Sequence, residues 1–142
     1  AALIRLMTSD PQSHVRLQAA QSLGRLGREA YFKSTAPIAE AYATVLRQDP
    51  SPQVRSAAAS GLSQMGSKAA PAASVLPAAL QDNSASVRSQ VLQTVIHLGP
   101  LASNCLDELI DIYNGPSDHY YSNNKDTVLQ AFAALGPDAA SK

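Results

Sequence analysis

Apolar residues recur three or four positions apart in several stretches of the chain, which is the spacing of one buried face of an α-helix. The first clear stretch begins at Val15 and ends at Leu26. Similar stretches begin at Val54, Val87 and Val128. The pattern predicts amphipathic helices that each pack one apolar stripe against the rest of the molecule.

These helical stretches form an internal repeat, in which an aspartate precedes a Val-Arg pair and a glycine closes each copy. Val15, Val54 and Val87 lie 39 and 33 residues apart, and a weaker fourth copy has Asn124 in that position, 37 residues after Val87. Periods of this length are typical of arrays of helical hairpins. The repeated charged residues are the aspartates Asp10, Asp49 and Asp82 and the cations Arg16, Arg55, Arg88 and Lys125.

A second apolar stretch precedes each of these helices, so each copy predicts two helices joined by a turn. The preceding stretches are Leu3–Met7, Ile38–Leu46, Ala72–Leu80 and Leu106–Tyr113. The aspartate segments carry turn and helix-capping chemistry, and a glycine suits the position just after a helix. Proline suits the first turn of a helix, where its missing N–H costs no hydrogen bond. The glycines are Gly27, Gly66, Gly99 and Gly136, and the prolines that mark first-helix starts are Pro37, Pro71 and Pro100.

The pattern Asp-Pro-x-x-x-Val-Arg-x-x-Ala-Ala-x-x-Leu-x-x-Leu/Met-Gly resembles HEAT repeats, most closely the short bacterial HEAT-like repeats first named from phycobilisome lyases. The resemblance implies an all-α fold, an α-solenoid (α-α superhelix) of about four helical hairpins in one domain. The signatures of tetratricopeptide and ankyrin repeats are absent. The expected repeats are approximately 1–27, 28–66, 67–99 and 100–136, with 137–142 opening a further one.

The repeated charges allow two interpretations. In the families that the chain resembles, the repeated arginine stacks between neighbouring units and bonds the aspartates of their loops, so its charge is used inside the array. Alternatively, the arginines form an exposed row of cations for phosphate or carboxylate groups. We favour the structural ladder, whose members are Asp10, Arg16, Asp49, Arg55, Asp82 and Arg88.

The composition narrows the class of protein. Hydrophobic residues make up 45% of the chain, which excludes a disordered protein. Eleven basic residues balance eleven acidic ones, which argues against a nucleic-acid partner and against a basic membrane-binding patch. Cys105 is the single cysteine, so no internal disulfide can form, and a cytoplasmic location is expected.

No catalytic constellation is visible, and neither enzymatic activity nor a cofactor or metal is expected. His14, His97 and His119 lack the spacing of metal ligands. Cys105 lies near the start of an expected helix, where the pKa of a thiol can fall, but a small buried cysteine is the favoured interpretation.

The remaining candidate surface is the outward face of the second helices, which in such arrays lines the concave side. Counting 100° per residue also places Gly24, Ser56, Ser60 and Ser63 there. Tyr120 and Tyr121 lie in the irregular segment 115–124 and either contact a partner or cover the core. The expected partner-binding residues are Leu17, Gln21, Arg25, Gln64, Gln93, Ile96, His97, Tyr120 and Tyr121.

The expected function is therefore that of a scaffold or adaptor segment that binds another protein. The family name raises an alternative, a bilin lyase or a lyase-accessory protein, although no residue here matches a catalytic residue of such enzymes. A DNA-repair glycosylase built on HEAT-like repeats is disfavoured, because it needs a basic concave face. The sequence leaves the oligomeric state open.

Overall fold

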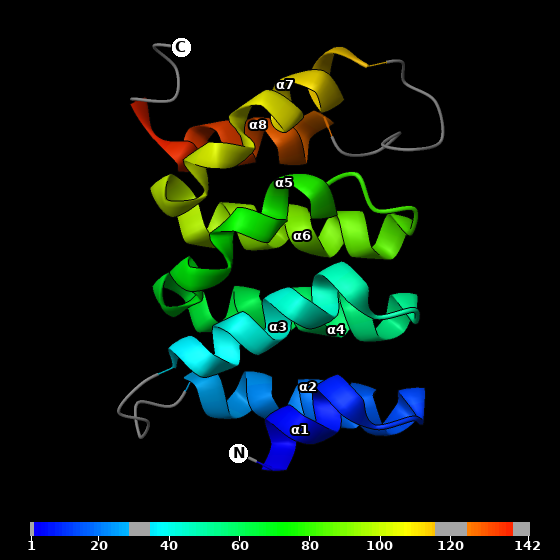
Figure 1. The fold of residues 1–142 in the computed structure, drawn as a ribbon. Coiled ribbons are helices and arrows are strands. Elements are labelled where there is room, and N and C mark those ends of the chain that lie inside the picture. Colours follow the sequence, from blue (N-terminus) through cyan, green and yellow to red (C-terminus); the bar gives the residue numbers. More distant parts are fainter. Residues whose placement is uncertain (1, 29–34, 116–124, 138–142) are drawn as a thin grey trace.

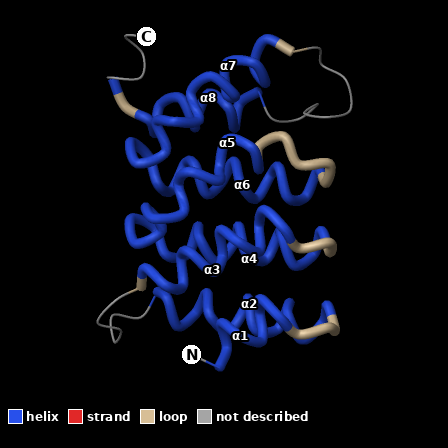
Figure 2. The backbone as a smooth tube through the Cα atoms, viewed as in Figure 1, coloured by secondary structure: helices blue, strands red, loops and turns tan. Residues whose placement is uncertain are grey.

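The computed structural model describes residues 2–28, 35–115 and 125–137, and these are helical apart from short connections (Figures 1 and 2). We call the successive helical hairpins the first to fourth units. The first contains α1 (Ala2–Ser9) and α2 (Ser13–Arg28), and the second contains α3 (Ala36–Gln48) and α4 (Pro52–Met65). The third contains the 3₁₀ helix η1 (Gly66–Val75), α5 (Leu76–Ala79) and α6 (Ala85–Leu98). The fourth contains the 3₁₀ helix η2 (Gly99–Cys105), α7 (Leu106–Asn114) and α8 (Lys125–Leu135).

The four units stack in chain order, so that the first and last helices lie at opposite ends of the molecule (Figure 1). The second helices form one continuous row, in which α2 packs on α4, α4 on α6 and α6 on α8. The segments before them form a second row, in which α1 contacts α3 and α3 contacts η1. This two-layered array confirms the predicted all-α solenoid.

The core is built from aliphatic residues and alanine, which allow helices to approach closely. The stripe residues Val54, Leu62, Val87 and Val95 are all completely buried. Burying one such side chain stabilises the fold by about 1.5–3 kcal/mol relative to leaving it exposed. Because each stripe faces both its own hairpin and the adjacent units, the stability of the array depends on stacking.

Three of the four predicted glycine positions hold, because Gly66, Gly99 and Gly136 have positive φ angles and directly follow second helices, and one does not. Gly66 and Gly99 have φ angles of 56° and 57°, a region that an L-residue rarely adopts, and each caps the end of a second helix. Gly27 was expected to end its helix but lies inside α2, which continues to Arg28. A glycine inside a helix weakens it without breaking it, so the residue alone does not fix the boundary.

Pro71 also departs from its predicted place. It lies inside η1 instead of at the start of a first helix. Proline lacks the N–H that the interior of an α-helix needs, so Pro71 lies in a 3₁₀ segment. Pro77 is tolerated only in the first turn of α5, so the α-helix begins there and stays short. Pro37 and Pro100 do lie in the first turn of α3 and η2, as predicted.

Candidate protein-interaction surface

A groove of about 750 Å³ runs across the second helices, from α2 over α4 to the first turns of α6. Side chains of α2 and α4 form most of its lining, and α6 supplies the far edge. The groove exists because the residues at these outward positions are small or polar and therefore leave space between the helices. The lining consists of Leu17, Ala20, Gln21, Arg25, Gln53, Ser56, Ala57, Ser60, Gly61, Gln64, Ser86 and Gln90.

The groove is polar but almost uncharged. Arg25 is the one charged residue among those that line it. Glutamine and serine supply the other polar groups, and each of these side chains can both donate and accept hydrogen bonds. Such a lining can pair with the N–H and C=O groups of another protein without requiring a strongly charged partner.

The groove brings together four of the predicted partner-binding residues, namely Leu17, Gln21, Arg25 and Gln64. Gln93 and His97 are exposed on α6 but do not line the groove. Tyr120 and Tyr121 lie outside the described residues.

Three apolar or small residues are less exposed than the sequence indicated. Leu17 and Ile96 were expected outside, but both are half-buried and pack against the core. Gly24 was placed on the outward face but is buried close to Tyr42 and Gly61. The reason is the close approach of adjacent second helices, which covers part of a face that would be open on a single hairpin.

Sequence reasoning missed the flanks of the groove. Gln53, Ser86 and Gln90 line it, although they do not belong to the predicted outward columns. Gln90 follows Ala57 by 33 residues, the repeat spacing, and both lie on the side of their helix that faces the preceding unit. In a stacked array this flank lines the space between two neighbouring helices. A helical-wheel projection of one isolated helix cannot show this.

His97 contacts other residues of the array. Its Nδ1 lies 2.9 Å from the Ser63 hydroxyl oxygen on α4 and 2.8 Å from the carbonyl oxygen of Gln93. The histidine therefore links α4 to α6, and part of its hydrogen-bonding capacity is used within the array.

Arg16 joins the first unit to the second through a two-pronged ion pair. Its Nε donates to Asp49 Oδ2 at 2.7 Å and its Nη2 donates to Asp49 Oδ1 at 3.1 Å. Its Nη1 donates to the carbonyl oxygens of Asp10 and Pro11 in its own unit. The hydrogen bond to Asp49 raises the pKa of Arg16 further above its ordinary value, against the opposing effect of burial.

Arg55 repeats this arrangement one unit later. Its Nε and Nη2 donate to the two carboxylate oxygens of Asp82 at 2.9 and 3.0 Å, and Nη2 also donates to Asn83 Oδ1 at 3.0 Å. Its Nη1 donates to the carbonyl oxygen of Asp49 at 2.9 Å. Arg88 Nη1 makes the equivalent bond to the carbonyl oxygen of Asp82 at 2.7 Å.

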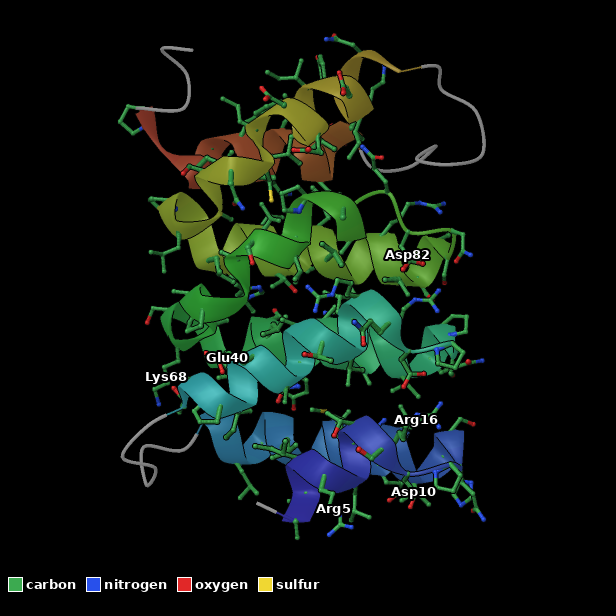
Figure 3. All side chains as sticks on the ribbon, in the orientation of Figure 1. Arg5, Asp10, Arg16, Glu40, Lys68 and Asp82 are labelled. Atoms are coloured by element: carbon green, nitrogen blue, oxygen red, sulfur yellow. The ribbon has the colours of Figure 1, made fainter. Side chains whose placement is uncertain are left out.

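The aspartates also shape the loops in which they lie. Asp10, Asp49 and Asp82 each accept a hydrogen bond from the backbone N–H two residues later. Each carboxylate thus closes a turn between the two helices of its unit. Figure 3 shows Asp10, Arg16 and Asp82 along one edge of the array. The guanidinium groups of Arg16 and Arg55 are therefore engaged within the array, which favours the structural ladder over a row of free cations.

Cys105 is completely buried, and burial raises the pKa of its thiol to about 12. This corrects the possibility of a lowered thiol pKa at a helix start. Within the described ranges, no three His, Cys, Asp or Glu side chains are grouped as a metal site would require. The described helices also lack the combination of length and apolar character that crossing a membrane needs.

Comparison with known protein families gives two matches. A family model described as HEAT repeats matches residues 39–135, and a second model, of a single HEAT repeat, matches residues 1–30. No curated protein matches the chain. The matched models describe HEAT repeats in general, so the closer resemblance to phycobilisome-lyase-type repeats and the bilin-lyase alternative stay predictions.

Proposed function

The chain belongs to the HEAT-repeat family, and from this membership and the groove on its second helices we propose that it is a scaffold or adaptor segment that binds another protein. HEAT repeats are commonly protein-interaction scaffolds. The observation that carries the proposal is the groove across α2, α4 and α6, whose lining is polar and carries one charge. Its residues come from three consecutive units, so a bound partner would follow the axis of the stack.

The chemistry of the groove indicates the character of the partner. Arg25 can pair with one carboxylate, whereas Gln21, Gln64 and the serines suit neutral hydrogen-bonding groups. The arginines Arg16 and Arg55 are already bonded to aspartates, which leaves them unsuited to binding phosphates. We therefore expect recognition of a protein surface or segment with few charges and only modest sensitivity of the affinity to salt.

The experiment is affinity capture followed by titration of the identified partner. Gln64→Arg places a long charged side chain in the groove at an exposed position, and we expect it to weaken binding at least tenfold. Gln81→Arg is the matched control, because Gln81 is also exposed but lies outside the groove, just after α5.

Two results would contradict the proposal. Equal affinities of the two variants would remove the groove as the binding surface. A steep loss of affinity with rising salt would indicate a charge-dominated site elsewhere, since only Arg25 is charged among the groove residues.

A further inference from the structure

Several polar side chains of the groove have no hydrogen-bond partner in the part of the chain that the structure describes. Gln21 on α2, Ser56 on α4 and Gln90 on α6 line the groove, and none of the three makes a side-chain hydrogen bond to a described residue. Thr94, a polar residue on the buried side of α6, instead donates to the carbonyl oxygen of Ala59 at 2.8 Å. The array thus uses this buried polar group for stacking, and the donors and acceptors of the groove remain available to a partner.

Arg25 carries the one charge of the groove, and this charge is uncompensated there. The side chain is exposed and forms no ion pair with a described residue, and no Asp or Glu lines the groove. The arginines of the ladder differ, because Arg16 and Arg55 are each paired with an aspartate. Guanidinium groups bind carboxylates through two parallel hydrogen bonds. Arg25 therefore favours one carboxylate on the molecule that fills the groove.

The small residues of the groove let a partner approach the helices closely. Ala20, Ala57 and Gly61 belong to the lining and carry nothing beyond a Cβ atom. Leu17 is the one large apolar side chain of the lining, and it is half-buried. Such a lining offers little apolar contact to a row of large side chains, whereas a main chain can lie close against it.

An extended main chain is the chemical match for this lining. The amide of glutamine carries N–H donors and a carbonyl acceptor, the same groups as a peptide bond. An extended segment leaves one N–H and one C=O per residue open to such groups, whereas a helix bonds its own main chain internally. An apolar helix face over Gln21 and Gln90 would leave their covered amides unpaired, at a cost in free energy.

The dimensions of the array set the length of this segment. The second helices α2, α4 and α6 lie in successive layers of the stack, and the groove crosses from the first of them to the third (Figure 1). Packed helices lie about 8–10 Å apart, so two steps cover roughly 16–20 Å. At about 3.3 Å per residue, an extended segment of about six residues spans this distance.

We propose that the groove binds an extended segment of about six residues from another protein, with an Asp or Glu side chain of the segment paired with Arg25. The inference rests on the proposed function and narrows it to a partner that presents a linear segment. The amides of Gln21 and Gln90 and the hydroxyl of Ser56 bond main-chain groups of the segment, and Leu17 contacts one apolar side chain. Main-chain groups are common to all sequences, so the carboxylate supplies most of the selectivity.

The first test offers two random libraries to the folded chain, because the partner is unidentified. One contains linear peptides longer than the groove, and the other displays random residues on the exposed face of a helical hairpin. We expect binders from the linear library, with an Asp or Glu at one fixed position. The double variant Gln21→Met and Gln90→Met, which removes both amides and keeps the side-chain length, should weaken them at least about tenfold. Gln81→Met is the matched control, because Gln81 is exposed outside the groove.

The second test separates the carboxylate from the main chain. Arg25→Glu should weaken a selected peptide at least about tenfold, and replacing the acidic residue of the peptide by Lys should restore most of the affinity for this variant. Arg47→Glu is the control, because Arg47 is exposed outside the groove, and it should leave binding unchanged. Methylation of single main-chain nitrogens of the peptide should weaken binding at every second residue, because alternate N–H groups of an extended chain point to opposite sides.

Three results would overturn the inference. The linear library could yield no binder that the double glutamine variant weakens. The binders could come from the helical library and be weakened by Gln64→Arg, which would keep the groove as the binding surface and assign it a helical partner. Finally, methylation could weaken binding equally at every residue or nowhere. The titration of a captured partner with Gln64→Arg and Gln81→Arg tests the proposed function separately, so the failure of one is distinguishable from the failure of the other.

Discussion

The ring of Tyr42 fills the space that a side chain at Gly61 would occupy. Tyr42 on α3 is completely buried, and its hydroxyl donates to the carbonyl oxygen of Ala20 on α2. A Cβ atom at Gly61 on α4 would lie 2.6 Å from the tyrosine oxygen and 2.7 Å from its Cε2. The glycine thus lets an aromatic residue of a first helix pass between two second helices.

The third unit reaches the equivalent carbonyl by another route. Thr94 follows Gly61 by 33 residues, and its Oγ1 donates at 2.8 Å to the carbonyl oxygen of Ala59, which is the counterpart of Ala20. Val75 follows Tyr42 by the same 33 residues and is half-buried, so a smaller aliphatic residue stands at the tyrosine position of this unit. At both interfaces one side-chain hydroxyl donates to a carbonyl oxygen of the preceding second helix. A glycine at the position of Gly61 leaves room for the hydroxyl of Tyr42, whereas a threonine at that position, Thr94, supplies the hydroxyl itself.

Replacing Gly61 should therefore destabilise the fold. We expect Gly61→Ala to lower the free energy of unfolding by about 1–3 kcal/mol, because the added atom overpacks the site. Gly61→Thr alone should cost more, whereas Gly61→Thr combined with Tyr42→Val should recover much of the loss by recreating the pair Val75 and Thr94 of the third unit. Urea unfolding of the variants measures these differences.

Gly24→Ala is the control for these variants. A Cβ atom there would lie 3.4 Å from its nearest neighbours, an ordinary contact distance. Alanine also stabilises a helix interior by about 0.5–1 kcal/mol relative to glycine, so this variant should be neutral or more stable. Comparable losses at the two glycines would show that helix packing, and not the tyrosine, limits the site.

Cys105 gives a prediction about pH and reactivity. Since its pKa is raised to about 12 in the folded chain, mainly by burial, the folded thiol stays protonated at pH 8 and should react very slowly with a disulfide reagent such as DTNB. In the unfolded chain the thiol ionises near pH 9, so the folded state binds more protons between about pH 9 and pH 12. Its contribution to stability must consequently fall as the pH rises through this window.

The measurement compares labelling rates in buffer and in denaturant, and the unfolding free energy of wild type and Cys105→Ala at rising pH. The alanine variant should lack the part of the alkaline destabilisation that the thiol causes. Rapid labelling of the folded chain would show that the thiol is accessible.

The ladder predicts that arginine and lysine are not interchangeable at position 55. Arg55 holds both oxygens of Asp82 and two further acceptors, a geometry that the single ammonium group of lysine cannot reproduce. Arg55→Leu, which leaves Asp82 unpaired at 11% side-chain exposure, should cost roughly 3–5 kcal/mol. Arg55→Lys should fall between this variant and wild type.

Chemical denaturation and a double-mutant cycle with Asp82→Asn isolate the coupling between the two side chains. Arg47→Ala is the control, because Arg47 is exposed, and its effect should stay within about 0.5 kcal/mol. A loss at Arg55 no larger than at Arg47 would contradict a stabilising ladder.

The repeat explains why the fold was predictable and the groove only partly so. Val54, Val87 and the Asp–Arg positions recur in register, and such recurrence specifies buried stripes and their order along the array. Tyr42 and Gly61 of the second unit are replaced by Val75 and Thr94 in the third, and the contacts that link each pair join different helices and units, so no single repeat explains the exchange. The flanks of the groove arise in the same way, because stacking turns the side of one helix into a wall. Counting the outward positions of an isolated helix therefore predicted Gln21 and Gln64 as surface residues of the groove but missed Gln90.

The assignment of helix faces is tested by two substitutions on α4, Val54→Asp and Ser60→Asp, which lie six residues apart. Val54 is completely buried in the stripe, and an unpaired carboxylate there should cost several kcal/mol, about 3–5, because a buried charge lacks compensation. Ser60 is partly exposed and lines the groove, where the hydroxyl accepts a long hydrogen bond of 3.4 Å from Gln64. Ser60→Asp should therefore change the unfolding free energy by less than about 1 kcal/mol, since water still solvates the new charge. Thermal melts of both variants decide the matter: similar losses would mean that the groove face of α4 is as dry as its stripe, and would remove the surface to which a partner is proposed to bind.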